Sequence, residues 1–259
     1  MAIENLNEVI LDKVRGVTTH DLATNGLLFR LTSVEDSSLQ VAAEGEEIVD
    51  AVGSPITTLY RAKKATYSAS NSLISLDLAA AQWGTKKEVA TVENKFTAYT
   101  YEICTVADGK IVLSNKPSKE IKEIYTVAIG EINKKYVAGA DVSDTEFTVN
   151  ADTKTITVPT GVTGKIFVEY TYETDKAVRI INKTSDYPEA CQLVIYAIFR
   201  DKCNENIKYA GTIICPKAKL NPEQVELALT STGKHPFEFK MNKDYCDEDG
   251  ELFTVIIAE

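Results

Sequence analysis

Histidine is scarce in this chain, and the common catalytic motifs are missing. The 259 residues include only two histidines, His20 and His235, although general acid–base catalysis uses histidine most often. The sequence also lacks the phosphate-binding GxxxxGK[ST] and GxGxxG loops, the zinc helix HExxH and the nucleophile elbow GxSxG. We therefore predict no catalytic residues and no bound cofactor. His20 is expected in a polar loop, and both histidines are expected to be structural or solvated.

Cysteine usage argues against a disulfide framework and against a zinc site. The five cysteines are odd in number and include no C-x-x-C pair. We expect them to be buried free thiols. They are Cys104, Cys191, Cys203, Cys215 and Cys246.

Long apolar runs are also absent. The longest, LVIYAIF at 193–199, is too short to cross a bilayer. The opening MAIENLNEVILDKVRG has no basic segment followed by an apolar one, so it does not resemble a secretory signal. We expect a protein that folds in a cytosol and has no membrane partner.

Positive charge is in deficit. The chain has 28 basic and 38 acidic residues, which gives a formal charge of -10. A duplex-binding surface needs clustered lysine and arginine to displace counterions. The acidic excess therefore predicts a surface that repels nucleic acid.

One acidic stretch, DYCDEDGELF at 244–253, invites comparison with a calcium loop. An EF-hand loop needs Asp at position one and a bidentate Glu at position twelve. The best alignment places Tyr245 first and Ile256 twelfth. We therefore predict no metal site and interpret the stretch as a turn between two strands, since Asp249-Gly250 is a turn dipeptide.

A single short helix is predicted within LISLDLAAAQWG, at 73–84. The three alanines at 79–81 are strong helix formers. Ser75 is a possible N-cap, and Gly84 stands where a helix end favours a residue with positive φ. The helix should flank a sheet.

Strand patterns dominate the rest of the chain. FTAYTYEICTV, Asp108-Gly109 and KIVL together have the pattern of a hairpin with a primed turn. Turn signals recur every 8 to 12 residues through this region, as in a small β-sandwich. The sequence predicts a mainly β protein with a sandwich or barrel-like core and one short flanking helix. Further strands are expected at 165–173, 207–220, 225–232, 237–242 and 251–258.

Two of the strands have informative side-chain patterns. KIFVEYTYE alternates so that Ile166, Val168, Tyr170 and Tyr172 share one face. The apolar run at 193–199 is continuous, which predicts a strand buried on both faces.

Four stretches together resemble bacteriophage tail tube proteins, which are structural proteins of the virion. They are GEEIVDAVGSPITTLYRAKKATYSASNSLISLDLAAAQWGT, NKTSDYPEACQLVIYAIFRD, GTIICPKAKLNPEQVELALTSTG, and HPFEFKMNKDYC with LFTVIIAE. The similarity covers about two thirds of the chain and lies in pattern more than in any single motif. Residues 101–174 resemble an added immunoglobulin-like β-sandwich inserted into a tail-tube-like core made of residues 1–100 and 175–259.

The resemblance implies self-assembly, genome delivery and a set of partners. Six copies would close into a hexameric ring, and rings would stack into a tube through which the genome passes. Six chains of formal charge -10 carry -60 per ring, and an acidic lumen would let DNA slide without specific binding. Other partners would be a sheath or terminator protein and a baseplate initiator. The protein would be made in the bacterial host cytoplasm and end in the virion.

Subunits of such a tube need exposed edges that pair with a neighbour. The candidate edges are the N-terminal arm and the segment around Ile48 to Ile56, where Glu44 and Asp50 add repulsion before assembly. A local hairpin of the same domain is the equally simple interpretation of this segment. The predicted assembly residues are Glu46, Glu47, Ile48, Val49, Val52 and Ile56.

Two other functions stay open on sequence grounds. The protein could be a capsid or tail decoration or host-surface binding module whose central sandwich holds a glycan or a protein. It could also be an enzyme that uses carboxylates alone. Changes at 45–60 should disable a tube subunit, whereas changes in the sandwich loops should disable a binding module.

Overall fold

The computed structural model describes residues 8–204, 206–223, 233–243 and 250–258. The chain forms two compact units. We call them the barrel unit, residues 1–87 and 180–259, and the middle unit, residues 88–179. Each unit has a separate hydrophobic core.

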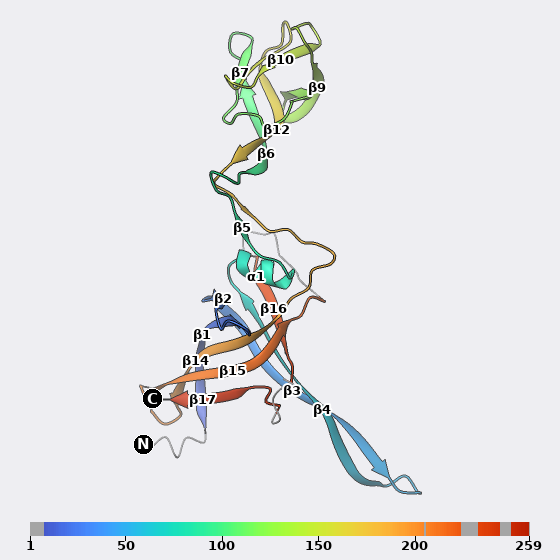
Figure 1. Ribbon diagram of the computed structural model, residues 1–259, viewed down its shortest axis with the longest axis vertical. Coiled ribbons are helices and arrows are strands. Elements are labelled where there is room, and N and C mark those ends of the chain that lie inside the picture. The colour runs from blue at the N-terminus through green and yellow to red at the C-terminus, as the bar shows by residue number, and fades with distance from the viewer. Residues whose placement is uncertain (1–7, 205, 224–232, 244–249, 259) are drawn as a thin grey trace. The chain divides into compact units, whose positions relative to one another are not determined.

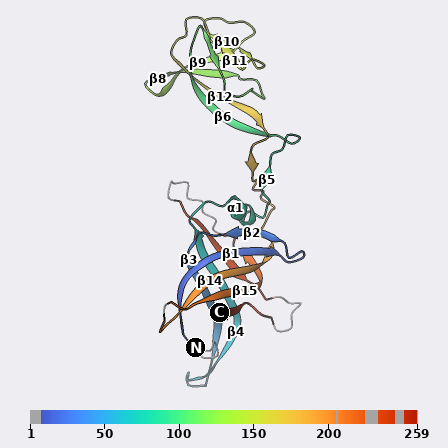
Figure 2. The same cartoon turned by 90° about the vertical axis from the view of Figure 1, so that its left-hand side faces the viewer.

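The described residues of the barrel unit form one eight-stranded antiparallel sheet. Its strands follow the order β2-β1-β14-β15-β16-β4-β3, and β17 pairs with β15 beyond the end of β16. Because β1 also contacts β3, the sheet curls into a nearly closed barrel (Figures 1 and 2). The strands are β1 (Val9–Asp21), β2 (Leu27–Leu31), β3 (Val34–Val49), β4 (Pro55–Asn71), β14 (Ala190–Asp201), β15 (Lys208–Leu220), β16 (His235–Met241) and β17 (Thr254–Ala258).

Alternating side chains fill the barrel. In residues 65–71 of β4 and throughout β16 every second residue is buried, as expected for strands with one face toward a core. The prediction of a mainly β fold with a barrel-like core and a short helix is confirmed. The residues that meet inside are Val17, Phe29, Leu31, Ala65, Tyr67, Ala69, Leu78, Cys191, Leu193, Ile195, Cys215, Ala218, Leu220, Phe237, Phe239 and Met241.

The helix α1 (Leu76–Gln82) lies at one end of the barrel, and its caps are the predicted ones (Figure 1). The Ser75 hydroxyl accepts a hydrogen bond from the Leu78 amide at 3.2 Å. Gly84 follows the helix with φ +69°, the left-handed conformation that terminates helices. Leu78 is fully buried with the barrel core, so α1 covers that core.

Hydrogen bonds of a buried histidine connect α1 to β16. His235 is fully buried, and its Nδ1 accepts a hydrogen bond from the Ser75 amide at 3.2 Å. Its Nε2 therefore carries the proton and donates to Gln82 Oε1 at 2.7 Å. Gln82 Nε2 donates in turn to the Pro236 carbonyl at 2.9 Å. The structural role predicted for His235 is confirmed, and burial lowers its pKa.

The middle unit has its own antiparallel and parallel pairings. Its seven-stranded sheet has the order β6-β12-β8-β9-β10-β11-β7. A separate pair, β5 with β13, joins the beginning and the end of the unit. The strands are β5 (Glu88–Val89), β6 (Phe96–Thr105), β7 (Lys110–Val112), β8 (Glu123–Ala128), β9 (Glu131–Ala138), β10 (Glu146–Asn150), β11 (Thr155–Thr157), β12 (Lys165–Thr174) and β13 (Val178–Arg179).

The predicted face of β12 is confirmed. Ile166, Val168 and Tyr170 are buried and Tyr172 packs against the same cluster. Because β12 lies between β6 and β8, this face supplies much of the middle unit's core.

The primed turn at Asp108-Gly109 is also confirmed. The predicted pairing of the two strands on either side of it into a hairpin is wrong. Both residues have positive φ, +50° and +72°, as a type I′ turn requires. Only one bridge, between Ala107 and Lys110, joins the two sides. β7 then pairs with β11, and β6 pairs with β12, because the long-range ladders outcompete the local one.

Replacing Gly109 with alanine should destabilise the middle unit by about 1 kcal/mol. Nothing lies within 4 Å of a Cβ placed there, so the cost is conformational and not steric. Denaturant unfolding followed by circular dichroism measures it. The Gly109→Asn chain is the control, because asparagine tolerates positive φ. Equal losses in both variants would contradict this explanation.

Three other expectations are wrong. His20 lies in β1 and not in a loop, because the polar stretch around it pairs with β14 through Gln192. In β14, Tyr196 is 41 % exposed, so the strand is not buried on both faces, since none of the described elements covers its outer face there. Cys203 is exposed and Cys104 half-buried, whereas Cys191 and Cys215 are buried; all four are free thiols.

Several predicted features lie outside the described residues. They are the strand at 225–232, the acidic stretch through residue 249, the N-terminal arm and Cys246.

Candidate assembly surface

The predicted assembly residues come together at the end of a long hairpin. β3 and β4 pair far beyond the barrel, and residues 42–64 form an arm (Figure 1). We call 46–59 the arm tip. It contains all six predicted residues: Glu46, Glu47, Ile48, Val49, Val52 and Ile56. The segment around Ile48 to Ile56 is thus mostly paired strand, as the local-hairpin interpretation predicts, and the turn occupies only 50–54.

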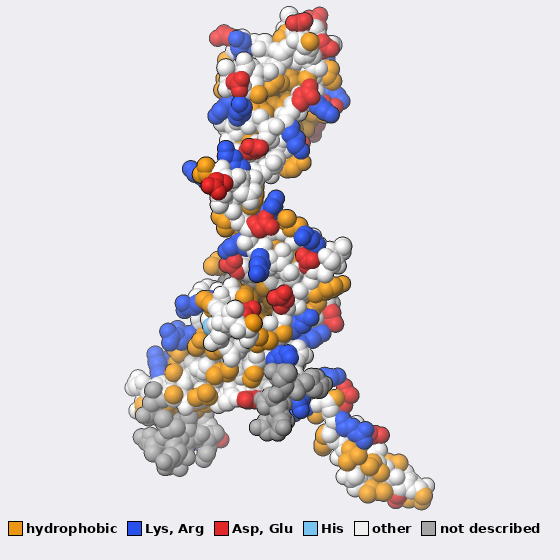
Figure 3. Space-filling model, viewed as in Figure 1, with side chains coloured by type: hydrophobic (Ala, Val, Ile, Leu, Met, Phe, Trp, Pro, Cys, Tyr) orange, Lys and Arg blue, Asp and Glu red, His pale blue; other side chains and the backbone are white. Residues whose placement is uncertain are grey.

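Apolar side chains of the arm lack a core. Val52 is 85 % exposed and Ile56 66 % exposed, and neither belongs to the barrel's hydrophobic cluster. The pairing register places Ile48 and Leu59 on one face of the arm and Tyr60 on the other. Hydrophobic atoms are visible along the projecting arm in Figure 3. Packing within the described part of the chain does not explain these residues, and contiguous exposed apolar surface marks interaction sites.

Asp50 shapes the turn of the arm. Its Oδ1 accepts hydrogen bonds from the amides of Val52 at 2.9 Å and Ser54 at 2.8 Å. Gly53 takes φ +85°, which a residue with a side chain rarely adopts. These contacts hold Val52 outward at the extreme end of the arm.

Ion pairs connect the two strands of the arm at the base of its tip and below it. Lys64 Nζ lies 2.6 Å from Glu44 Oε1, and the hydrogen bond from Lys64 lowers the pKa of Glu44. Arg61 lies 3.4 Å from Glu46. All four side chains are mostly exposed, so these pairs orient the strands more than they stabilise them.

Sequence reasoning missed an apolar groove beside α1, which we call the α1 groove. Its volume is about 310 Å³. Leu27 and Leu28 line it while 58 % and 49 % exposed. Two adjacent leucines in a strand are a sequence signal for such a groove. Alternation would bury only one of them in the core, so the other needs a second apolar surface. The groove is lined by Leu27, Leu28, Phe29, Asp77, Ala80, Ala81, Gly84, Thr85, Lys86, Lys87, Glu189, Cys191 and Leu220.

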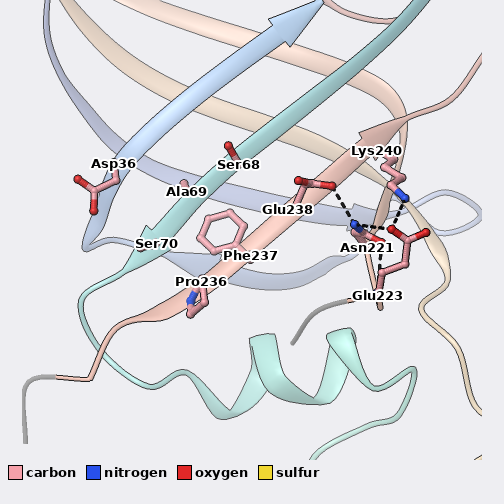
Figure 4. Close-up of a pocket in the computed structure, with 10 residues that line it drawn as sticks. All are labelled: Asp36, Ser68, Ala69, Ser70, Asn221, Glu223, Pro236, Phe237, Glu238 and Lys240. Atoms are coloured by element: carbon pink, nitrogen blue, oxygen red, sulfur yellow. Dashed lines mark hydrogen bonds and ion pairs between the residues drawn. The ribbon is translucent and has the colours of Figure 1, made fainter. Parts of the chain in front are cut away.

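A second groove, of about 640 Å³, is polar and lies over β4 and β16 (Figure 4). Side chains in and beside this groove are joined by hydrogen bonds and ion pairs. Asn221 Nδ2 donates to Glu238 Oε1 at 2.9 Å, and Lys240 lies 3.1 Å from Glu223. Lys234 binds Asp36 at 2.8 Å. These contacts cross-link the surface of the barrel.

The middle unit carries an aromatic face that sequence reasoning did not single out. Tyr99 and Tyr101 project from β6 while 77 % and 66 % exposed. The Tyr101 ring stacks on Phe167 of β12 at 5.6 Å, and Tyr125 of β8 meets Phe167 edge-on at 6.3 Å. The opposite face of these strands packs into the core.

Comparison with known families identifies the family of the chain. The model of the YomU/Tube protein family matches residues 9–255. The chain belongs to this family. No curated protein matches it. As a YomU/Tube protein, the chain is a structural protein of the phage tail tube and a component of the virion, and it assembles with itself and with other tail proteins.

The match to the YomU/Tube family spans both units. It begins at β1 and ends within β17, so it includes the arm, α1 and the middle unit. No helix in the described part of the chain combines the length and apolar composition needed to cross a bilayer.

Proposed function

We propose that this YomU/Tube protein forms hexameric rings that stack into the tail tube, and that the arm tip is its assembly surface. The observation that carries the proposal is the arm itself. It presents Ile48, Val52 and Ile56 to solvent on a hydrogen-bonded ladder that leaves the barrel. Such a ladder costs little conformational entropy when a partner covers it.

The acidic charge of the chain agrees with a role as a channel for DNA. Six chains of formal charge -10 give -60 per ring. A lumen that carries part of this charge would repel DNA phosphates, so the genome would pass without specific contacts. Subunits would be made in the host cytoplasm, with a baseplate initiator and a sheath or terminator protein as further partners.

Electron microscopy of the purified protein over a concentration series tests this function, with light scattering for the mass in solution. We expect rings and tubes of constant diameter with sixfold views. A monomer that stays monodisperse at every concentration, even with the other tail proteins added, would contradict self-assembly.

We also propose that the middle unit binds a host-surface carbohydrate from the outside of the tube. Residues 101–174 would form the immunoglobulin-like module of this function, inserted between core segments 1–100 and 175–259. Exposed Tyr101 favours it, with Tyr99 two residues before it on the same strand, because aromatic rings pack against the C–H face of a sugar while their hydroxyls hydrogen-bond. Glu169, paired with Tyr101 in the ladder, adds an acceptor.

Replacing Tyr99 and Tyr101 together with alanine should weaken carbohydrate binding at least about tenfold. The full chain would be tested on an array of bacterial surface polysaccharides. The control is Tyr187→Ala, because Tyr187 is similarly exposed but belongs to the barrel unit. Equal binding by all three proteins would rule out the aromatic face.

A further inference from the structure

We propose that an uncharged sugar unit of the surface carbohydrate occupies a groove of the middle unit beside Glu169, and that this groove selects neutral sugars over charged ones. This inference rests on the proposed carbohydrate binding and adds to it the site and the class of ligand. We call this site the β12 groove. Its volume is about 370 Å³, and Tyr99 of the aromatic face lines it.

The β12 groove forms where two strands of the middle unit separate. β8 pairs with β12 only as far as the partners Tyr125 and Phe167. Because β6 occupies the other side of β12 throughout, the next backbone contact on the β8 side is the hydrogen bond from the Ser118 amide to the Thr171 carbonyl at 2.8 Å. Between these two points, residues 168–170 have no ladder partner on this side among the described residues. A groove is therefore left in the sheet at this edge of β12.

Tyrosines lie on both sides of Glu169. Tyr101 of β6 is its ladder partner. The hydrogen bond to Glu123 raises the pKa of Tyr125 of β8, and the nearby charge of Glu169 adds a smaller rise. The exposed Glu169 carboxylate thus has a tyrosine on each neighbouring strand. Aromatic rings pack against the C–H face of a sugar, and a carboxylate accepts hydrogen bonds from its hydroxyls.

The charges of the β12 groove favour an uncharged ligand. Its lining includes three carboxylates and two ammonium groups. The carboxylate of Glu123 is already engaged, because Lys135 Nζ lies 2.5 Å from its Oε1 and the Tyr125 hydroxyl donates to its Oε2 at 2.6 Å. The other four charged side chains have no ion-pair partner among the described residues; they are Glu120, Glu169, Lys119 and Lys122. Since two positive and two negative charges cancel, neither an anion nor a cation is preferred, whereas sugar hydroxyls can donate to the carboxylates and accept from the ammonium groups.

The size of the β12 groove suits a small part of a polymer. A volume of about 370 Å³ lies near the lower end of the range for small-molecule sites, roughly 300–1,000 Å³. It admits a short saccharide and excludes a folded domain. Because Tyr99 lines the groove and lies on the same strand as Tyr101, a sugar chain can fill the groove and continue over the aromatic face.

Polysaccharide binding by the Glu169→Ala chain tests the site. The unchanged full chain and this variant would be compared on uncharged bacterial surface polysaccharides and on anionic ones that carry phosphate or uronate groups. We expect the unchanged chain to bind the uncharged polymers at least about tenfold more tightly, because an anionic group would meet the Glu169 carboxylate. Glu169→Ala should lose at least about tenfold in affinity for the uncharged polymers. Glu169 is exposed, so the fold should tolerate the change.

The matched control is Glu173→Ala. Glu173 is an exposed carboxylate farther along the same face of β12, and it does not line the groove. This variant should bind like the unchanged chain. If Glu169→Ala and Glu173→Ala bound equally well, or if anionic polymers bound as tightly as uncharged ones, the inference about the β12 groove would be overturned while carbohydrate binding by the aromatic face remained. An unchanged chain that binds no polysaccharide would overturn the proposed carbohydrate function as well.

Discussion

Replacing Ile48 and Val52 with aspartate is expected to abolish tube formation. Both side chains lie in the arm tip, where contact with a partner would bury them. Each substitution forces a carboxylate into that contact without a counterion, which costs several kcal/mol. The concentration needed for assembly should rise at least about 100-fold. Sedimentation of tubes across a protein concentration series, with electron microscopy of the pellet, measures it.

The control for this variant is Val92→Asp with Ile129→Asp. These two residues are also highly exposed, but they lie in the middle unit. The control should assemble like the parent, and both variants should keep the parent's circular dichroism spectrum. If the Ile48→Asp, Val52→Asp chain formed tubes at the same concentration as the parent, the arm tip would not be part of the assembly surface.

Replacing His235 with alanine should destabilise the barrel unit by roughly 3 kcal/mol. The change leaves a cavity where a fully buried ring stood and removes the partners of the Ser75 amide and of Gln82. Because these bonds join α1 to β16, the helix should loosen first. Hydrogen exchange of the amides at 78–82 would detect this loss, and denaturant unfolding would give its size.

His235 should also make the stability of the barrel unit depend on pH. Burial lowers the folded-state pKa of His235 below the ordinary histidine pKa of about 6.5. The unfolded chain therefore binds a proton first as the pH falls. The contribution of His235 to stability is complete above pH 6.5 and declines below it, by up to about 1.4 kcal/mol per pH unit.

Unfolding free energies at pH 7.0 and 5.5 test this dependence. The difference between the two values should be smaller in His235→Ala than in the parent. An equal decline in the parent and in His235→Ala would show that other groups cause it.

Local features of this fold were predictable from the sequence, whereas long-range pairings were not. Ser75, Gly84 and the turn at Asp108-Gly109 act within a few residues of themselves, so their conformations follow from residue type. The partner of β7 is β11, more than forty residues away. Hydrophobic alternation shows that such a strand exists and which face it buries, but it does not show which strand it joins.

The same limit applies to the candidate site. The arm tip is one continuous segment, and its apolar and acidic residues could be recognised together. The α1 groove is assembled from β2, α1 and the ends of β14 and β15. Leu28 and Leu220 are far apart in the chain, so only the closed barrel brings them to one surface.

The pairing of β5 with β13 has a consequence for how this chain can vary. Val89 and Val178 are ladder partners, so the middle unit begins and ends at neighbouring points. The ion pair of Arg179 with Glu88 fastens the same junction at 2.5 Å. A segment with adjacent ends can be excised or exchanged without stretching the chain on either side. We therefore expect residues 90–177 to be replaceable, so that a foreign domain grafted between Val89 and Val178 leaves the register of the barrel unchanged.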